Sequence, residues 1–111
     1  MDIDQMDQVM TNLLENAARH APAGSEITVS SARWRDALEI RVSDHGPGVP
    51  PDERERVFEP FVRSETGREG GAGLGLSIAR AIVENHGGKI WIEGGPGGGA
   101  VVVFRIPDGA H

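Results

Sequence analysis

Apolar residues recur every three or four positions over two stretches of the chain, which is the spacing of one face of an α-helix. The first stretch runs from Asp4 to about Ala21, and the second runs from Leu74 to His86. Asp4 stands where its side chain can cap the start of the first helix, and Gly87 follows the second stretch as a C-terminal stop. The pattern therefore predicts two long helices.

Strict alternation of apolar and polar residues marks the strands. Ile27 and Val29 alternate with polar neighbours, as do the apolar residues of 38–42, and the turn-forming residues 35–37 separate the two runs. This pattern predicts an antiparallel hairpin. Residues 89–93 and 100–106 are predicted to form two more strands, on either side of the glycine-rich turn 94–99.

A short helix is predicted between these two pairs of strands. Pro50 and Pro51 suit the first turn of a helix, which would then run through Phe58. The resulting order of helices and hairpins predicts an α+β fold, in which helices cover one face of a mixed, mainly antiparallel sheet in a two-layer α/β sandwich. With 111 residues, we expect a single domain spanning 1–111.

Composition excludes some classes of partner. The formal net charge is -6, from 17 acidic and 11 basic residues, and no run of Lys or Arg could neutralise a row of phosphates, so we expect no nucleic acid partner. The chain has no cysteine, which fits the cytoplasm and would equally fit a small periplasmic protein. Residues 1–4 lack the features of a signal peptide, and no apolar run could span a bilayer. We expect a cytoplasmic domain that does not touch the membrane.

Two asparagines stand one turn apart in the first predicted helix. Asn12 and Asn16 share a face although Asn is a poor helix former, because its side chain competes for backbone hydrogen bonds. An amide oxygen is a neutral ligand suited to Mg²⁺, and Arg19 and His20 lie one turn further along, where they could meet phosphate oxygens. The alternative interpretation is an ordinary solvated polar face.

A second group of candidates follows the predicted second strand. Asp44 could accept a hydrogen bond from an exocyclic amine such as that of adenine, while Gly46 and Gly48 would let the backbone approach a flat base. An ordinary turn is the alternative for this Asp-x-Gly-x-Gly pattern.

The third group is Gly71-Ala72-Gly73-Leu74-Gly75-Leu76, which leads directly into the second long helix. Free backbone N–H groups and the positive helix end would face a bound phosphate there. A flexible loop before a helix start would explain the same residues. No Gly-Lys-Ser/Thr ends the segment and no G-x-G-x-x-G occurs, which disfavours the other common phosphate-binding folds.

Taken in this order and spacing, these segments resemble the histidine-kinase ATPase family, part of the superfamily shared with type II topoisomerases, ninety-kilodalton heat-shock chaperones and MutL proteins. Residues 12–20 look like the N box of this family, 44–48 like its first glycine box, 58–61 like its F box and 71–76 like its second glycine box. The resemblance covers nearly the whole chain and implies a Bergerat-type ATP-binding fold.

The resemblance also implies roles for single residues. Asn16 would be the chief Mg²⁺ ligand with Asn12 assisting, Arg19 and His20 would touch phosphates, and Asp44 would bind the adenine amine. Phe58 and Phe61 would pack under a lid formed by residues 62–72. The expected ATP-binding residues are Asn12, Asn16, Arg19, His20, Asp44, Gly46, Gly48, Phe58, Gly71, Gly73, Leu74, Gly75 and Leu76. Ala100 stands where many relatives have threonine, so a hydrogen bond to the nucleotide would be lost.

By the same resemblance, the domain binds Mg-ATP and donates the γ-phosphate to a histidine on a separate dimerisation domain, and so acts indirectly on a response regulator. Relatives that hydrolyse ATP or phosphorylate serine have a glutamate at position 12, and an amide cannot act as a general base at neutral pH. The alternatives are an anti-sigma-factor-type serine kinase, a small hydrolytic ATPase and a degenerate interaction domain.

Nothing in the chain matches the phosphoacceptor motif of the family. We therefore expect no autophosphorylation by this chain alone, with His45 and His86 solvated or capping rather than phosphorylated. The family has one or two strands upstream of the N box, so we expect the sheet to lack them here. The chain would then be an excised domain, a subunit of a split kinase, or a chain that takes a strand from another.

Overall fold

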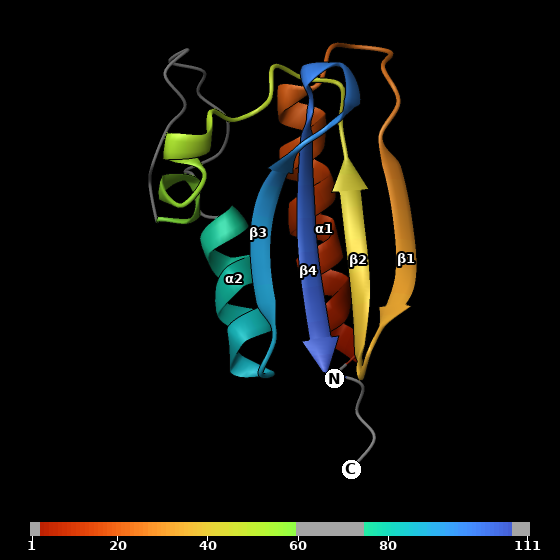
Figure 1. Ribbon diagram of the computed structural model, residues 1–111, viewed down its shortest axis with the longest axis vertical. Coiled ribbons are helices and arrows are strands. Elements are labelled where there is room, and N and C mark those ends of the chain that lie inside the picture. The colour runs from red at the N-terminus through yellow and green to blue at the C-terminus, as the bar shows by residue number, and fades with distance from the viewer. Residues whose placement is uncertain (1–2, 60–74, 108–111) are drawn as a thin grey trace.

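The computed structural model describes residues 3–59 and 75–107. The chain folds into two layers, with helices packed on one face of a single sheet (Figure 1). The elements are helices α1 (Ile3–His20) and α2 (Gly75–Asn85), strands β1 (Thr28–Trp34), β2 (Ala37–Ser43), β3 (Lys89–Gly94) and β4 (Ala100–Pro107), and 3-10 turns η1 (Pro51–Glu53), η2 (Arg56–Phe58) and η3 (Pro96–Gly98).

The sheet has the strand order β1-β2-β4-β3. Each of its three pairings is antiparallel, with Val29 opposite Val42, Ile40 opposite Phe104 and Ile90 also opposite Phe104. The predicted α+β two-layer sandwich is confirmed. The described strands contain no parallel pair, because the β3–β4 hairpin places β4 between β2 and β3 and so reverses direction at every step.

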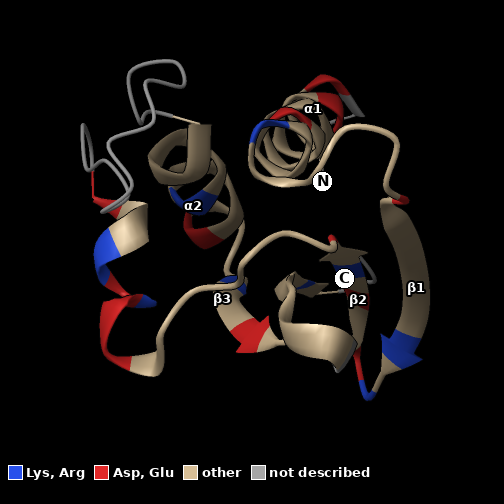
Figure 2. Cartoon of the chain, turned by 90° about the horizontal axis from the view of Figure 1, so that it is seen from above, with Lys and Arg blue, Asp and Glu red and all other residues tan. Residues whose placement is uncertain are grey.

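The core lies between the helices and one face of the sheet. Val9 and Leu13 of α1 are fully buried, as are Val83 of α2 and Phe104 of β4. Figure 2 shows α1 and α2 side by side above the sheet, so the apolar stripes of both helices meet the same layer of strand residues. Burial of these stripes is the main force that holds the two layers together.

Two local predictions differ from the structure. Asp4 lies inside the first turn of α1, which begins at Ile3. Its carboxylate therefore interacts favourably with the positive end of the helix, but Asp4 is not the cap residue. The short helix predicted for 50–58 is instead two separate 3-10 turns. Their backbone bonds connect residues three apart, as in Phe58 N–H to the Glu55 carbonyl at 3.2 Å, a pattern common in short connecting segments.

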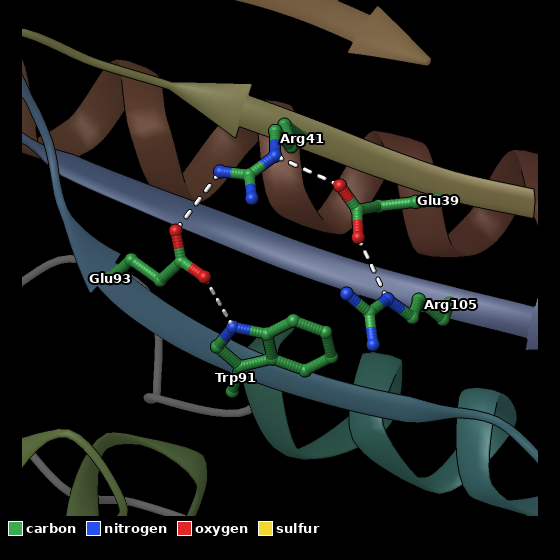
Figure 3. Close-up of polar contacts among 5 residues, drawn as sticks. All are labelled: Glu39, Arg41, Trp91, Glu93 and Arg105. Atoms are coloured by element: carbon green, nitrogen blue, oxygen red, sulfur yellow. Dashed lines mark hydrogen bonds and ion pairs between the residues drawn. The ribbon is translucent and has the colours of Figure 1, made fainter. Parts of the chain in front are cut away.

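No described helix covers the other face of the sheet, and polar side chains cover it instead (Figure 3). Glu39 accepts hydrogen bonds from Arg41 at 3.0 Å and Arg105 at 2.7 Å, while Glu93 accepts from Arg41 at 3.0 Å and from the Trp91 indole at 2.8 Å. We call these five residues the outer-face network. It crosses β2, β4 and β3 and ties them together.

Aromatic rings extend this cover across β1. The guanidinium of Arg105 lies 3.5 Å from the centroid of the Trp34 ring and 4.9 Å from that of Trp91. The guanidinium of Arg35 lies 4.7 Å from the same Trp34 centroid. Val103 is fully buried although it is on this face. The stacked side chains therefore keep water from the middle of the sheet where no helix does so.

The outer-face network should make stability depend on pH. The guanidinium of Arg105, followed by that of Arg41, holds the pKa of Glu39 below its ordinary 4.5, and hydrogen bonds from Trp91 and Arg41 lower the pKa of Glu93. A carboxyl group whose pKa is lowered on folding stabilises the fold at a pH above its unfolded value, and this contribution is lost as the pH falls through the folded value.

We therefore expect the denaturation midpoint to fall as the pH is lowered below about 4.5, and to fall less steeply in Glu39→Gln. Urea denaturation between neutral pH and pH 3 would measure this slope. Glu26→Gln changes an exposed glutamate outside the network and serves as the control. Equal slopes for the two variants would contradict a contribution from the network.

Candidate functional site

The C-terminal half of α1 contacts two segments that are far from it in sequence. A Cβ atom on Gly46 would lie 2.5 Å from the carbonyl oxygen of His20, so the loop after β2 touches the C-terminal end of α1. A Cβ atom on Gly75 would lie 3.8 Å from the carbonyl oxygen of Asn12, so α2 begins against the middle of α1. The structure thus brings the first two predicted groups together with the start of α2.

Asp44 is the buried acid of this region, with 7% of its surface exposed. Its Oδ1 accepts hydrogen bonds from the backbone N–H groups of Gly46 at 2.8 Å and Ala100 at 3.4 Å, and its own N–H donates to the Ala100 carbonyl at 3.0 Å. These bonds fix the carboxylate through Oδ1. Its Oδ2 remains able to accept a hydrogen bond from a ligand.

Glycines hold the loop of Asp44 against the turn between β3 and β4. Gly48 has a φ of 79°, which glycine adopts readily, and a Cβ there would overlap the carbonyl oxygen of Gly98. A Cβ on Gly99 would overlap the carbonyl oxygen of Asp44 itself. The sequence shows the glycine cluster at 94–99 only as a turn, and its close packing on Asp44 emerges from the fold.

The polar stripe of α1 supplies the second part of the site. Among the buried side-chain nitrogen and oxygen atoms of the described residues, Nδ2 of Asn12 lacks a hydrogen-bond partner. An unsatisfied buried amide costs free energy, so such a group often marks a place for a ligand or water. Asn12 faces the region where α2 begins, because its Cβ atom is within 3.9 Å of the position that a Cβ on Gly75 would take.

Asn16 and His20 interact along the same stripe. The Nδ1–H of His20 donates to the backbone carbonyl of Asn16 at 2.8 Å, so Nε2 is the ring atom left for a ligand, and it can donate to a phosphate oxygen only when the ring carries both protons. Arg19 is half-buried beside them. Within residues 3–59 and 75–107, no group of three or more His, Cys, Asp or Glu side chains could hold a metal ion. Amide oxygens can also ligate a cation, and an asparagine can turn its amide to present either atom.

The remaining predicted residues divide into two sets. Phe58 is 4% exposed and Leu76 is 7% exposed, so both side chains lie in the core, and Leu76 could meet a ligand only through its backbone N–H. Gly75 opens α2. Outside the described residues are Phe61, Gly71, Gly73, Leu74 and the proposed lid at 62–72.

Comparison with known families decides the classification. The profile of the histidine kinase-, DNA gyrase B- and HSP90-like ATPases matches residues 1–110. The chain belongs to this ATPase family. The resemblance in the sequence motifs is thus confirmed, and ATP binding is the activity that the family implies.

Relatives of this ATPase domain occur in sensor kinases. The chain is 43% identical over 108 residues to the alginate biosynthesis sensor protein KinB of Pseudomonas aeruginosa, and 43% identical over 109 residues to the adaptive-response sensory kinase SasA of Parasynechococcus marenigrum. Each match covers 96% of this chain, but only 18% of KinB and 28% of SasA. The chain thus spans less than a third of these curated relatives.

Solved structures show the same fold. The mycobacterial sensor histidine kinase MprB superposes with a TM-score of 0.87 at 32% identity, covering 96% of this chain and 72% of that one. The catalytic domain of the histidine kinase ThkA superposes with a TM-score of 0.83 at 35% identity, covering 96% and 68%. The ATPase domain therefore has the architecture of the catalytic domain of sensor histidine kinases. Neither described helix combines the length and apolar character that crossing a bilayer requires.

Proposed function

We propose that this ATPase domain binds Mg-ATP and donates the γ-phosphate to a histidine on a separate dimerisation domain in two-component signalling. The observation that carries the proposal is Asp44, buried at the end of β2 and held through Oδ1 so that Oδ2 can accept a hydrogen bond from the adenine amine. Gly46 and Gly48 let the Asp44 loop pack closely on the backbone of His20 and Gly98, which holds the carboxylate in place.

The phosphate side of the site would lie between α1 and the start of α2. The backbone N–H groups of Gly75 and Leu76, at the positive end of α2, would bind phosphate oxygens together with Arg19 and His20. Asn16, assisted by Asn12, would hold Mg²⁺ through amide oxygens, and the unpartnered Nδ2 of Asn12 could donate to a phosphate oxygen beside the metal. Bound there, Mg²⁺ would neutralise charge on the phosphates during transfer.

Asn12 favours phosphoryl transfer over hydrolysis. An amide cannot remove a proton from water or serine at neutral pH, so the nucleophile must be activated by the domain that brings it. This argues against a hydrolytic ATPase and an anti-sigma-factor-type serine kinase. His45 is exposed, and the Nδ1–H of His86 donates to the Ile82 carbonyl at 2.8 Å, which fits solvated and capping roles. The partner would be a phosphoacceptor domain, acting in turn on a response regulator.

Calorimetric titration with ATP tests this function. We expect binding in Mg²⁺, weaker binding in EDTA, and a loss of roughly tenfold in Mg²⁺-dependent affinity for Asn16→Ala, which is the scale of one lost ligand interaction of about 1.4 kcal/mol. Asn85→Ala, an exposed asparagine at the end of α2, is the matched control and should bind like the starting protein.

Absence of ATP binding by a folded sample would overturn the proposal. If binding is confirmed, a phosphoacceptor domain supplied in trans should take up label from γ-labelled ATP. ATP turnover by the domain alone, without such an acceptor, would instead support the hydrolytic alternative.

A further inference from the structure

Arg80 of α2 makes contacts that reach beyond its own helix. Its Nε donates to Glu84 at 3.0 Å one turn further on, while its Nη1 donates to Glu55 at 3.0 Å, just before η2. Its guanidinium also lies 5.3 Å from the centroid of the Phe58 ring. Arg80 thus joins α2 to the turn that contains Phe58.

The segment 49–59 connects the Asp44 loop to this turn. At its beginning, Nε of Arg54 donates to the carbonyl of Val49 at 3.0 Å, and a Cβ on Gly94 would lie 3.3 Å from Nη2 of Arg54. At its end, Phe58 is buried beside α2. Arg54 therefore holds one end of the segment near the loop of Asp44, and Arg80 holds the other end on α2.

Helix α2 carries this connection to the phosphate side of the site. It starts at Gly75 beside Asn12, and Arg80 is little more than one turn further along the same rigid element. The segment 49–59 thus gives a second connection between the Asp44 loop and α2, in addition to the packing of α2 on α1.

We propose that Arg80 is a positioning residue that fixes the Phe58 turn on α2 and so holds the adenine and phosphate sides of the site at their working separation. The effect on nucleotide binding rests on the proposed function. An ordinary surface ion pair is the competing explanation, since the Arg80 side chain is 33% exposed and that of Glu55 is 76% exposed, and such pairs contribute little. Contact with Phe58 and the link between two elements distinguish Arg80 from such a pair.

Hydrogen exchange tests the contact without any nucleotide. In the ligand-free protein, Arg80→Gln should speed exchange of the Phe58 and Glu59 amides about fivefold, and Glu55→Gln by a smaller factor. Glu84→Gln removes only the pair within α2 and should leave both amides within about twofold of the starting protein. The amide of Phe104 in the core reports global unfolding, and its exchange should speed by no more than the factor seen at Phe58, because the Arg80 contact is also lost on global unfolding.

Titration with Mg-ATP tests the consequence for binding. Arg80→Gln should weaken affinity by about three- to tenfold, Arg80→Lys by less, and Glu84→Gln not measurably. Faster exchange with unchanged ATP affinity would overturn the positioning role, as would unchanged exchange in Arg80→Gln. A starting protein that does not bind ATP would overturn the proposed function instead, and the exchange rates would still decide whether Arg80 holds the Phe58 turn.

Discussion

Replacing Asp44 by Asn is expected to weaken ATP binding by about 100-fold, because it removes a hydrogen bond to a charged acceptor and places an amide donor opposite the amine of adenine. The fold should survive, since the Oδ1 of Asn can still accept from the N–H groups of Gly46 and Ala100. Calorimetric titration of both proteins with Mg-ATP measures the change, and thermal unfolding shows whether the structure is retained.

Nucleotide choice provides a sharper test of the same contact. Guanine carries a carbonyl where adenine carries its amine, so the amide of the Asp44→Asn variant could donate to it. We expect the variant to lose much less affinity for Mg-GTP than for Mg-ATP. Asp36→Asn, an exposed aspartate between β1 and β2, is the control. Equal losses for the two nucleotides would show that Asp44 does not contact the base.

Replacing Gly99 by Ala should affect stability and binding together. The added methyl group would overlap the carbonyl oxygen of Asp44, so either the turn between β3 and β4 or the Asp44 loop must move. Overpacking of this kind costs about 1–3 kcal/mol. We expect urea denaturation to show this loss of stability, and titration with Mg-ATP to show a loss of affinity because the displaced backbone carries Asp44.

Gly97→Ala separates the two effects. Gly97 lies in the same turn with a φ of 75°, and a Cβ there would meet nothing within 4 Å. Its replacement should cost about 1 kcal/mol through backbone strain alone and leave ATP affinity unchanged. If Gly97→Ala lowered affinity as much as Gly99→Ala, the close packing on Asp44 would not be the cause.

Local sequence patterns predicted the regular elements well. The apolar spacing placed both helices within about one residue of their observed ends, because burial against one layer requires a single apolar face on each helix. All four predicted strands are present, although every residue of β1 is exposed, so alternation in that strand does not report burial. The prediction of one short helix over 50–58 was wrong in detail, since the prolines of this segment are equally compatible with a helix start and with 3-10 turns.

Neither the outer-face network nor the stacking of Trp34 against Arg105 was foreseen. Trp34, Trp91 and Arg105 occur on three different strands, and their stacking depends on which strands are neighbours and in which register they pair. Spacing along the chain contains neither piece of information, so these residues were indistinguishable from ordinary exposed strand positions.

By itself, the sequence determined the α+β class, the family and the chemistry available, because periodicity reports burial and the spaced Asn, Asp and Gly motifs report the groups that an ATP site needs. Only the tertiary structure decided which of these groups meet. The contacts of Gly99 with Asp44, Gly75 with Asn12 and Arg80 with Phe58 join residues distant in the chain. Such contacts depend on strand order and layer packing, which no local pattern specifies.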